Sequence, residues 1–292
     1  MAQCDNQGTL KSVEIICPLY NAGKYINDLH NSFLRQERVN LQRIHYILTE
    51  STDATEDILV KRNATYDKIT KNEFSHSLIR EKAALESKAD VIVFVTQDVR
   101  IDKRDWLYNL IKDIDIENER VVASYSRQLP KYDNIEKYAR EKNYPAKSSV
   151  VTVKDIPRLG LKTFFFSDTS SAVSRKVFKK LGGYDGKNLP TNEDMYFAYK
   201  LITNGYAIKY SADSEVIHSH DFTLRELYNR YKLAGKFFKE NPVLKRYGVN
   251  DSGMSLAVYI LKRIIEERKY KLLARYPLDM GARYIGMKVG AR

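Results

Sequence analysis

Cysteines and long apolar runs are scarce in this chain of 292 residues. The two cysteines, Cys4 and Cys17, are too few for a disulfide framework, and Cys17 ends an apolar run in which a buried thiol is expected. The longest apolar runs, such as Val91–Val95, have the length of a strand and fall far short of the roughly 18 residues of a membrane-spanning helix. The polar segment 1–11 lacks the apolar region of a signal peptide. These absences exclude a disulfide-stapled fold and indicate a cytosolic protein.

Acidic residues are also under-represented, since 37 Asp and Glu stand against 49 Lys and Arg, for a net charge of +12. Half of this excess lies in residues 253–292, where nine basic residues accompany three acidic ones. Such a basic excess is typical of proteins that bind nucleic acid, an anionic membrane surface or a phosphorylated substrate. Because the sequence has neither a nucleic-acid-binding motif nor an interleaved basic and aromatic stretch, we expect no nucleic-acid partner.

Strand-like and helix-like patterns alternate through the first half of the chain. We predict strands at 13–17, 44–48, 68–71 and 91–95, and helices at 22–36, 53–63 and 77–87. This alternation predicts an α/β fold with a Rossmann-like, mainly parallel central sheet flanked by helices. Ligands bind such sheets at the carboxyl ends of the strands, where this chain has Pro18–Asn21, Ser51–Asp53 and Thr96–Asp98.

The second half is less regular. We predict strands at 121–125, 206–210 and 215–217, and helices at 134–142, 175–181, 193–204 and 223–240. A cluster of Pro242, Gly248 and Gly253 suggests a boundary between a catalytic domain, residues 1–240, and a basic helical extension, residues 241–292. Within the extension, residues 254–276 carry one apolar helical stripe. Such a stripe suits either a helix on a membrane surface or a helix docked on the catalytic domain, and both interpretations stay open.

Several polar groups are candidates for chemistry. Asp98 follows an apolar strand, where a carboxylate either binds a divalent metal ion or caps the next element. Glu193 and Asp194 begin a helix that continues with apolar residues, so one of them is a candidate general base, although acids are also favoured there by the helix dipole. His218 and His220 are two residues apart on an extended segment, and we therefore expect only one of them to reach a given metal ion.

Two further groups have ambiguous patterns. Asp168, Thr169 and Ser170 follow the aromatic run 164–166 and could bind a sugar, while Asp168 could equally cap a following helix. Arg80 lies in an amphipathic helix, where it would share the charge of a diphosphate or remain a surface residue in an ordinary ion pair.

The order of these motifs resembles glycosyltransferase family 2, whose members have the GT-A fold and use nucleotide-sugar donors. Within that family the sequence is most similar to bacterial polysaccharide rhamnosyltransferases. The similarity spans about residues 12–290 and rests on the segments 96–98, 127–130, 143–145, 165–168, 182–185, 218–220 and 283–288.

The resemblance implies a nucleotide-sugar half at about 12–125, an acceptor half at about 126–240 and a role for each candidate residue. Asp98, with His218 or His220, would hold Mn²⁺ or Mg²⁺. Asp194 would be the catalytic base, supported by Glu193. The donor would contact Pro18, Tyr20, Asn21, Glu50, Asp53, Arg80 and Gln97, and the acceptor sugar would contact Asp168, Thr169 and Ser170.

Two departures from the family pattern affect the donor side. Acids that precede the Ser-x-Asp-x-Thr segment in the family are replaced by Leu48, Thr49 and Glu50, so Glu50 or Asp53 would have to substitute for them. Thr96 takes the place of the first acid in the Asp-x-Asp motif. Both changes point to weaker metal binding and an altered choice of nucleobase.

The expected reaction is an inverting transfer of L-rhamnose from dTDP-rhamnose to a lipid-linked or growing bacterial cell-surface polysaccharide. The basic extension places this reaction at an anionic membrane surface, with the enzyme peripheral to the inner face of the cell membrane. Two alternatives remain, a UDP-hexose or UDP-N-acetylhexosamine donor, and a catalytically silent nucleotide-sugar-binding scaffold. The oligomeric state is open, and a homodimer is one candidate.

Overall fold

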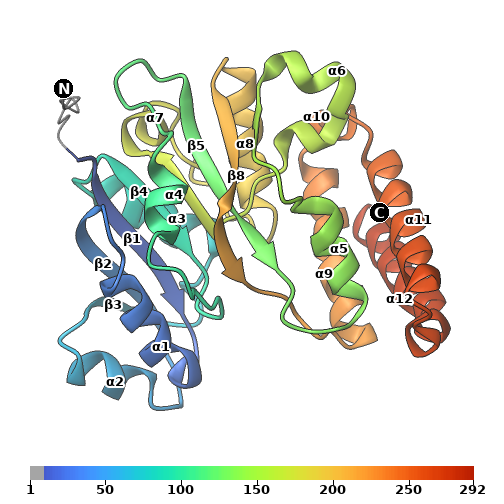
Figure 1. Ribbon diagram of the computed structural model, residues 1–292, viewed down its shortest axis with the longest axis horizontal. Coiled ribbons are helices and arrows are strands. Elements are labelled where there is room, and N and C mark those ends of the chain that lie inside the picture. The colour runs from blue at the N-terminus through green and yellow to red at the C-terminus, as the bar shows by residue number, and fades with distance from the viewer. Residues whose placement is uncertain (1–9) are drawn as a thin grey trace, which may run out of the picture.

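The structure, a computed structural model, describes residues 10–292, and of residues 249–252 only the backbone. Cys4 therefore lies outside the described residues. In this part of the chain the strands form one eight-stranded sheet in the order β3-β2-β1-β4-β7-β5-β8-β6 (Figure 1). The strands are β1 (Ser12–Leu19), β2 (Asn40–Thr49), β3 (Thr65–Ile69), β4 (Val91–Val95), β5 (Val121–Leu129), β6 (Ser149–Val151), β7 (Ser170–Ser174) and β8 (Ala207–Ile217).

The predicted mainly parallel sheet is confirmed. β1 pairs in parallel with β2 and β4, β2 with β3, and β5 with β8, whereas β7 runs antiparallel to β4 and β5, and β6 antiparallel to β8. The two segments predicted as separate strands at 206–210 and 215–217 are one strand, β8, with an irregularity opposite β5 where the register shifts from Ser211 to Glu215.

Helices connect and cover these strands. They are α1 (Gly23–Leu34), α2 (Thr55–Lys61), α3 (His76–Glu86), α4 (Trp106–Ile111), α5 (Ile135–Asn143), α6 (Ile156–Leu159), α7 (Arg175–Lys180), α8 (Glu193–Thr203), α9 (Leu224–Glu240), α10 (Pro242–Lys245), α11 (Val249–Glu266) and α12 (Tyr270–Gly290), with short 3₁₀ turns η1 (Val153–Asp155) and η2 (Gly160–Phe164). Of the described helices, none is both long and apolar enough to span a bilayer.

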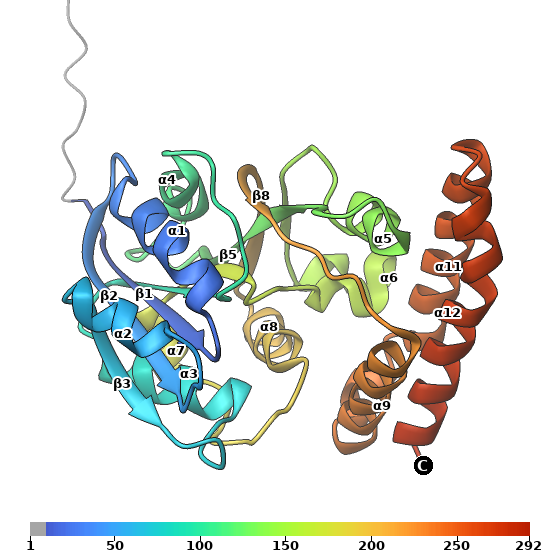
Figure 2. The same cartoon turned by 90° about the horizontal axis from the view of Figure 1, so that it is seen from below.

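The central strands of the sheet are buried on both faces, which explains the unbroken apolar run of β4. Val91, Val93 and Val95 pack with α1 and α4 on one face, and Ile92 and Phe94 pack with α3, α7 and α8 on the other. Figure 2 shows these two helical layers on either side of the strands. Successive residues of a strand point to opposite faces, so a strand covered on both sides is apolar at every position.

The C-terminal extension docks on the rest of the protein. Ile260 and Ile264 of α11 are fully buried against Ile135, Tyr138 and Ala139 of α5. The predicted continuous stripe over 254–276 is wrong, because the chain turns between α11 and α12, where Arg268 has a φ of 54°. The two helices then run side by side at the edge of the molecule (Figures 1 and 2).

Close contact between α9 and α12 depends on glycines. Cβ atoms added at Gly286 or Gly290 of α12 would collide with backbone oxygens of α9, at Tyr228 and Lys232, and one at Gly235 of α9 would collide with Met287 of α12. The proposed division at residue 240 therefore separates, in sequence, two helices that lie against each other in space.

The glycine contact gives a stability prediction. Gly286→Ala forces α12 away from α9 and should lower the free energy of unfolding by about 1–3 kcal/mol, as overpacking of a tight contact does. Gly281 is the matched control on the same helix, because a Cβ there meets nothing within 4 Å. Gly281→Ala should instead stabilise by about 0.5–1 kcal/mol through its helix propensity. Urea unfolding of both variants measures the difference, and equal effects would contradict the packing argument.

Candidate active site

A cavity of about 810 Å³ opens at the carboxyl ends of β1 and β4 and continues toward α5, α9 and α12. Its lining includes Pro18 at the end of β1 and Tyr20 just after it, Asp98 after β4, and Asp194 at the start of α8. This is the sheet edge at which the sequence predicted a ligand site.

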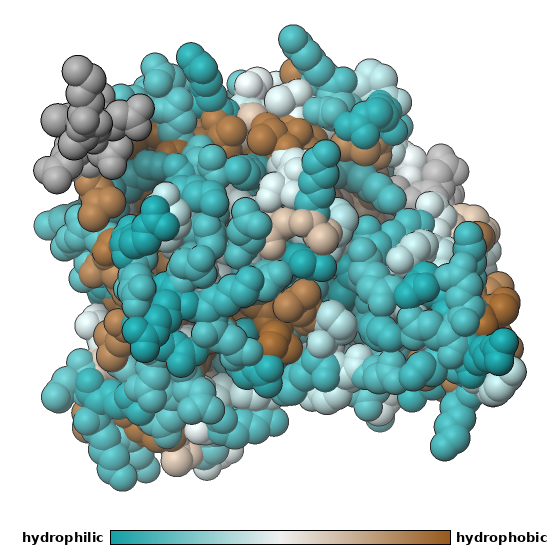
Figure 3. Space-filling view, in the orientation of Figure 1, coloured by the Kyte–Doolittle hydropathy of each residue, from teal (hydrophilic) through white to brown (hydrophobic). Residues whose placement is uncertain are grey.

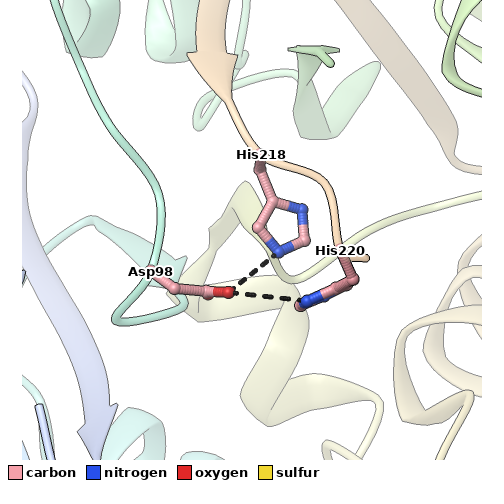
Figure 4. A group of neighbouring side chains, drawn as sticks. All are labelled: Asp98, His218 and His220. Carbon is pink, nitrogen blue, oxygen red and sulfur yellow. Dashed lines mark ion pairs between the residues drawn. The ribbon is translucent and has the colours of Figure 1, made fainter. Parts of the chain in front are cut away.

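Asp98, His218 and His220 come together in this cavity (Figure 4). One ligand atom from each lies within 4.8 Å of the others, and Asp98 Oδ2 is 3.5 Å from His218 Nε2 and 3.9 Å from His220 Nδ1. The expectation that only one histidine could reach the metal is wrong. β8 ends at Ile217, so the alternation of a regular strand does not extend over His218 and His220, whose imidazole rings lie 4.7 Å apart.

The surroundings of the triad favour metal-binding protonation states. Nδ1 of His218 is 3.0 Å from Oε1 of Gln128, so a proton on Nδ1 is held by Gln128 and Nε2 is left free to face Asp98. Burial and the neighbouring His218 lower the pKa of His220 to about 4. Burial acts to raise the pKa of Asp98, but the hydrogen bond and charge of His218 outweigh it and leave that pKa below its usual range. One carboxylate and two imidazoles therefore fit a divalent ion.

A second cluster in the cavity wall consists of the buried carboxylates of Asp168 and Glu193, the half-buried carboxylate of Asp194 and one guanidinium, that of Arg80. Asn192, in the left-handed conformation with a φ of 60°, turns the chain into α8 and sets Glu193 and Asp194 in its first turn. Oδ2 of Asp194 accepts a hydrogen bond of 3.4 Å from the backbone N–H of Asp168. Burial, with the negative charges of Glu193 and Asp168, raises the pKa of Asp194 well above its usual range. A carboxylate of raised pKa is, in its ionised form, a stronger base than an ordinary one.

Arg80 is the cation of this cluster and is not a surface residue, contrary to one of the two sequence interpretations. Its side chain is only 3% exposed, and Nη1 lies 2.9 Å from Oε1 of Glu193. Its Nε has no hydrogen-bond partner among the described residues, although Arg80 lines the cavity. Because this Nε is shielded from solvent, it does not itself open to the cavity.

Of the three residues predicted to contact the acceptor sugar, Ser170 does not line the cavity, and that prediction is wrong. Its hydroxyl lies in the core, 3.1 Å from Nε1 of Trp106 and 2.7 Å from the hydroxyl of Ser126. Asp168 and Thr169 do line the cavity, but the Asp168 carboxylate already accepts hydrogen bonds from Ser171 and Tyr184. The alternative of Asp168 as a helix cap is also wrong, because strand β7 follows it.

The predicted donor residues divide into two groups. Four of the seven, Pro18, Tyr20, Arg80 and Gln97, line the cavity. The Tyr20 backbone and the Gln97 amide exchange hydrogen bonds of 2.7 and 2.9 Å that hold the loops after β1 and β4 together. The remaining residues, Asn21, Glu50 and Asp53, do not line the cavity.

Asn21 and Asp53 instead brace the loops. The Asn21 side chain accepts a hydrogen bond of 2.9 Å from the N–H of Thr52, and Asp53 accepts one of 2.8 Å from the N–H of Gly23. A role for Glu50 in nucleobase contact stays a prediction.

Sequence reasoning missed several cavity residues. Arg283 and Gln128 lie in segments that carried the family resemblance, but nothing in their local pattern gave them a role. His76, Arg140 and Arg230 also line the cavity. They lie on three different helices, and the sequence pattern of a helix does not show which of its polar residues face a cavity.

Comparison with known proteins agrees with this geometry. Residues 14–182 match the family model described as Glycosyl transferase family 2. The O-antigen chain rhamnosyltransferase WbaN of Salmonella anatum is 32% identical over 96% of this chain and 90% of its own length. The O-antigen chain rhamnosyltransferase RfbN of Salmonella typhimurium is 30% identical over 95% and 89%.

Solved structures show the same fold. The mannosyltransferase PcManGT of Pyrobaculum calidifontis, in complex with GDP-Man and Mn²⁺, superposes with a TM-score of 0.62 at 15% identity, covering 97% of this chain and 86% of that one. Residues 1–349 of S. aureus TarS superpose with a TM-score of 0.51 at 16% identity, covering 95% and 90%. The GT-A fold predicted from the sequence is confirmed.

The chain belongs to glycosyl transferase family 2. It is a glycosyltransferase, with a helical C-terminal region added to a GT-A core.

Proposed function

We propose that this enzyme transfers L-rhamnose from dTDP-rhamnose to a bacterial cell-surface polysaccharide, with inversion at the anomeric carbon. The observation that carries this proposal is the similarity, at 32% and 30% identity, to two O-antigen chain rhamnosyltransferases along nearly the whole chain. The likeness reaches past the family model into the segment that holds Asp194, His218 and His220.

In this reaction each polar group of the cavity has a role. Asp194 takes the proton from an acceptor hydroxyl, whose oxygen forms a bond to the anomeric carbon as the bond to the diphosphate breaks on the opposite face. Glu193 and Arg80 position Asp194 through the buried cluster, and Thr169 contacts the acceptor sugar. Asp98, His218 and His220 would hold Mn²⁺ or Mg²⁺, which supplies positive charge for the departing diphosphate. Inversion of a β-linked donor gives an α-linked rhamnoside.

Incorporation of labelled sugar tests the proposed donor. The purified enzyme is incubated with a membrane lipid extract from cells that make the polysaccharide, and with labelled dTDP-rhamnose, a UDP-hexose or UDP-N-acetylhexosamine. The proposal predicts label in the lipid extract from dTDP-rhamnose alone. Label from a UDP-sugar would assign another donor to the same enzyme class.

We also propose that the protein works at the inner face of the cell membrane, on a lipid-linked acceptor. The outward sides of α11 and α12 carry apolar side chains that are more than half exposed, namely Met254, Val258, Ile265, Leu278, Tyr284 and Ile285. Brown atoms at the right edge of Figure 3 mark this face over the C-terminal helices. Exposed Arg268, Lys271 and Lys288 are near it in sequence. An apolar face with cations around it suits an anionic lipid surface.

Vesicle binding tests this face. Ile265→Glu combined with Ile285→Glu should reduce cosedimentation with anionic phospholipid vesicles at least tenfold, because two charges would have to enter the apolar layer. Leu34→Glu is the control, since Leu34 is 63% exposed on α1, far from this face in the fold. Unchanged vesicle binding, accompanied by a shift from dimer to monomer in the double variant, would assign the face to a homodimer instead.

A further inference from the structure

The cavity extends beyond the metal triad into a region lined by three arginines from three different helices. These are Arg140 of α5, Arg230 of α9 and Arg283 of α12. None of them belongs to the loops that follow β1 and β4, where the donor residues Tyr20 and Gln97 lie. The region therefore belongs to the acceptor side of the cavity.

Arg283 is held in place with one donor unused. Its side chain is 10% exposed, Nη1 donates a hydrogen bond of 2.6 Å to the hydroxyl of Tyr231, and Nη2 pairs with Glu136. Its Nε has no hydrogen-bond partner among the described residues. The two bonds hold the guanidinium at the cavity wall, and Nε, which is shielded from solvent, reaches no ligand without movement of the neighbouring atoms.

The positive charge here exceeds the negative charge. Arg140 shares Glu136 with Arg283, at 4.0 Å from Oε2. Arg230 is exposed, lies 5.6 Å from the ring centroid of Phe222 and, within residues 10–292 apart from 249–252, has no carboxylate partner. The carboxylate of Glu226, which also lines the cavity, is occupied by the N–H and hydroxyl of Thr223 at 2.8 Å. Three guanidinium groups thus face one engaged carboxylate, Glu136.

Apolar side chains line the same region, namely Ala139, Leu227, Leu233 and Leu256. Guanidinium groups match phosphate oxygens in geometry and charge, and neighbouring leucines favour a hydrocarbon. We propose that Arg140, Arg230 and Arg283 form a binding site for the phosphate groups of a prenyl-diphosphate-linked acceptor. The inference rests on the proposed function and names the chemistry of its acceptor. It also gives α12 a direct part in the site through Arg283.

Binding of geranyl diphosphate tests the site. Calorimetric titration is done with saturating dTDP and Mn²⁺, so that the donor side is already filled. Arg230→Gln is the principal variant, because Arg230 has no partner that the substitution would leave unpaired, and Arg225→Gln on the same helix is the control outside the cavity lining. We expect the Kd of Arg230→Gln to rise at least tenfold and that of Arg225→Gln to stay within twofold. Arg283→Gln, checked for folding by its melting temperature, should show a similar rise.

Two further probes separate the sources of affinity. Inorganic pyrophosphate should bind more weakly than geranyl diphosphate yet keep its dependence on Arg230, and geraniol, which lacks phosphate, should show no such dependence. An unchanged Kd for geranyl diphosphate in Arg230→Gln would overturn the site. So would an equal weakening of dTDP binding in that variant, since the arginine would then serve the donor.

The binding experiment tests the arginine site separately from the proposed reaction. Turnover of dTDP-rhamnose without Arg230-dependent binding of geranyl diphosphate would remove the acceptor site and leave the function standing. Arg230-dependent binding without turnover of dTDP-rhamnose would do the reverse.

Discussion

Asp194→Asn should lower the rate of sugar transfer by about 10²- to 10⁴-fold, the usual contribution of a general base, with little change in donor affinity. The asparagine amide keeps the shape of the carboxylate but cannot accept the acceptor's proton. Asp213→Asn is the control, because that side chain is 72% exposed and its ion pair, among the described residues, is with Lys112 at the surface. Steady-state kinetics with saturating donor measure the effect. Retention of more than a tenth of the rate would assign the proton to another group.

The same substitution should make the protein more stable. Burial and the charges of Glu193 and Asp168 raise the pKa of Asp194 in the folded protein, so folding favours its protonated form. This contribution to stability is fully present below the unfolded pKa of about 3.9 and is lost as pH rises through the folded pKa. Asn carries no charge, so Asp194→Asn should raise the melting temperature at pH 7 but not at pH 4. A lower melting temperature at pH 7 would contradict the buried repulsion.

Removal of divalent metal should abolish transfer, with a loss of at least about 100-fold, because the ion's charge contributes several kcal/mol to stabilising the leaving diphosphate. Asp98→Asn should cause a comparable loss, since it removes the single carboxylate of the triad. Asp102→Asn, a 57% exposed carboxylate farther along the same loop, is the control. Activity is measured after EDTA treatment and again after addition of Mn²⁺ or Mg²⁺. Full activity in EDTA would exclude a metal role for the triad.

A substitution of Gln128 should weaken metal binding without removing a metal ligand. Oε1 of Gln128 holds Nδ1 of His218, and its Nε2 donates a hydrogen bond of 2.6 Å to the hydroxyl of Tyr144. Such supporting hydrogen bonds typically change metal affinity by 10–100-fold when they are lost. Gln128→Leu should therefore raise the Mn²⁺ concentration needed for half-maximal activity, while saturating Mn²⁺ restores much of the rate.

The parts of the fold that the sequence predicted well are those with a strong hydrophobic pattern. β4 has the predicted bounds, because five consecutive apolar residues describe a strand buried on both faces. β7 was missed because Ser170, Ser171 and Ser174 gave it the composition of a loop, although all three are buried. The Ser170 hydroxyl pairs with Trp106 and Ser126, which are distant in the chain and which a local pattern does not reveal, whereas Ser171 donates to Asp168 and Ser174 caps α7.

The sequence predicted which motifs form the candidate site, but it did not predict the contacts between their side chains. Asp98 and Asp194 follow from their place at the end of a strand and the start of a helix. The approach of both His218 and His220 to Asp98 depends on where β8 ends. The pairing of Arg80 with Glu193 joins residues 113 positions apart. The far side of the cavity needs α12 to dock on α9, a contact that Gly235 and Gly286 make possible only in three dimensions.

Release of nucleoside diphosphate from a panel of donors, with Mn²⁺, Mg²⁺ or EDTA, tests the proposed enzyme most directly. Slow donor hydrolysis needs no acceptor, so wild type, Asp98→Asn and Asp194→Asn can be compared at once. We predict release from dTDP-rhamnose alone, dependent on metal and lost in both variants. Release from a UDP-sugar would overturn the donor, and the absence of release from every donor, with membrane lipid extract added, would indicate a catalytically silent nucleotide-sugar-binding protein.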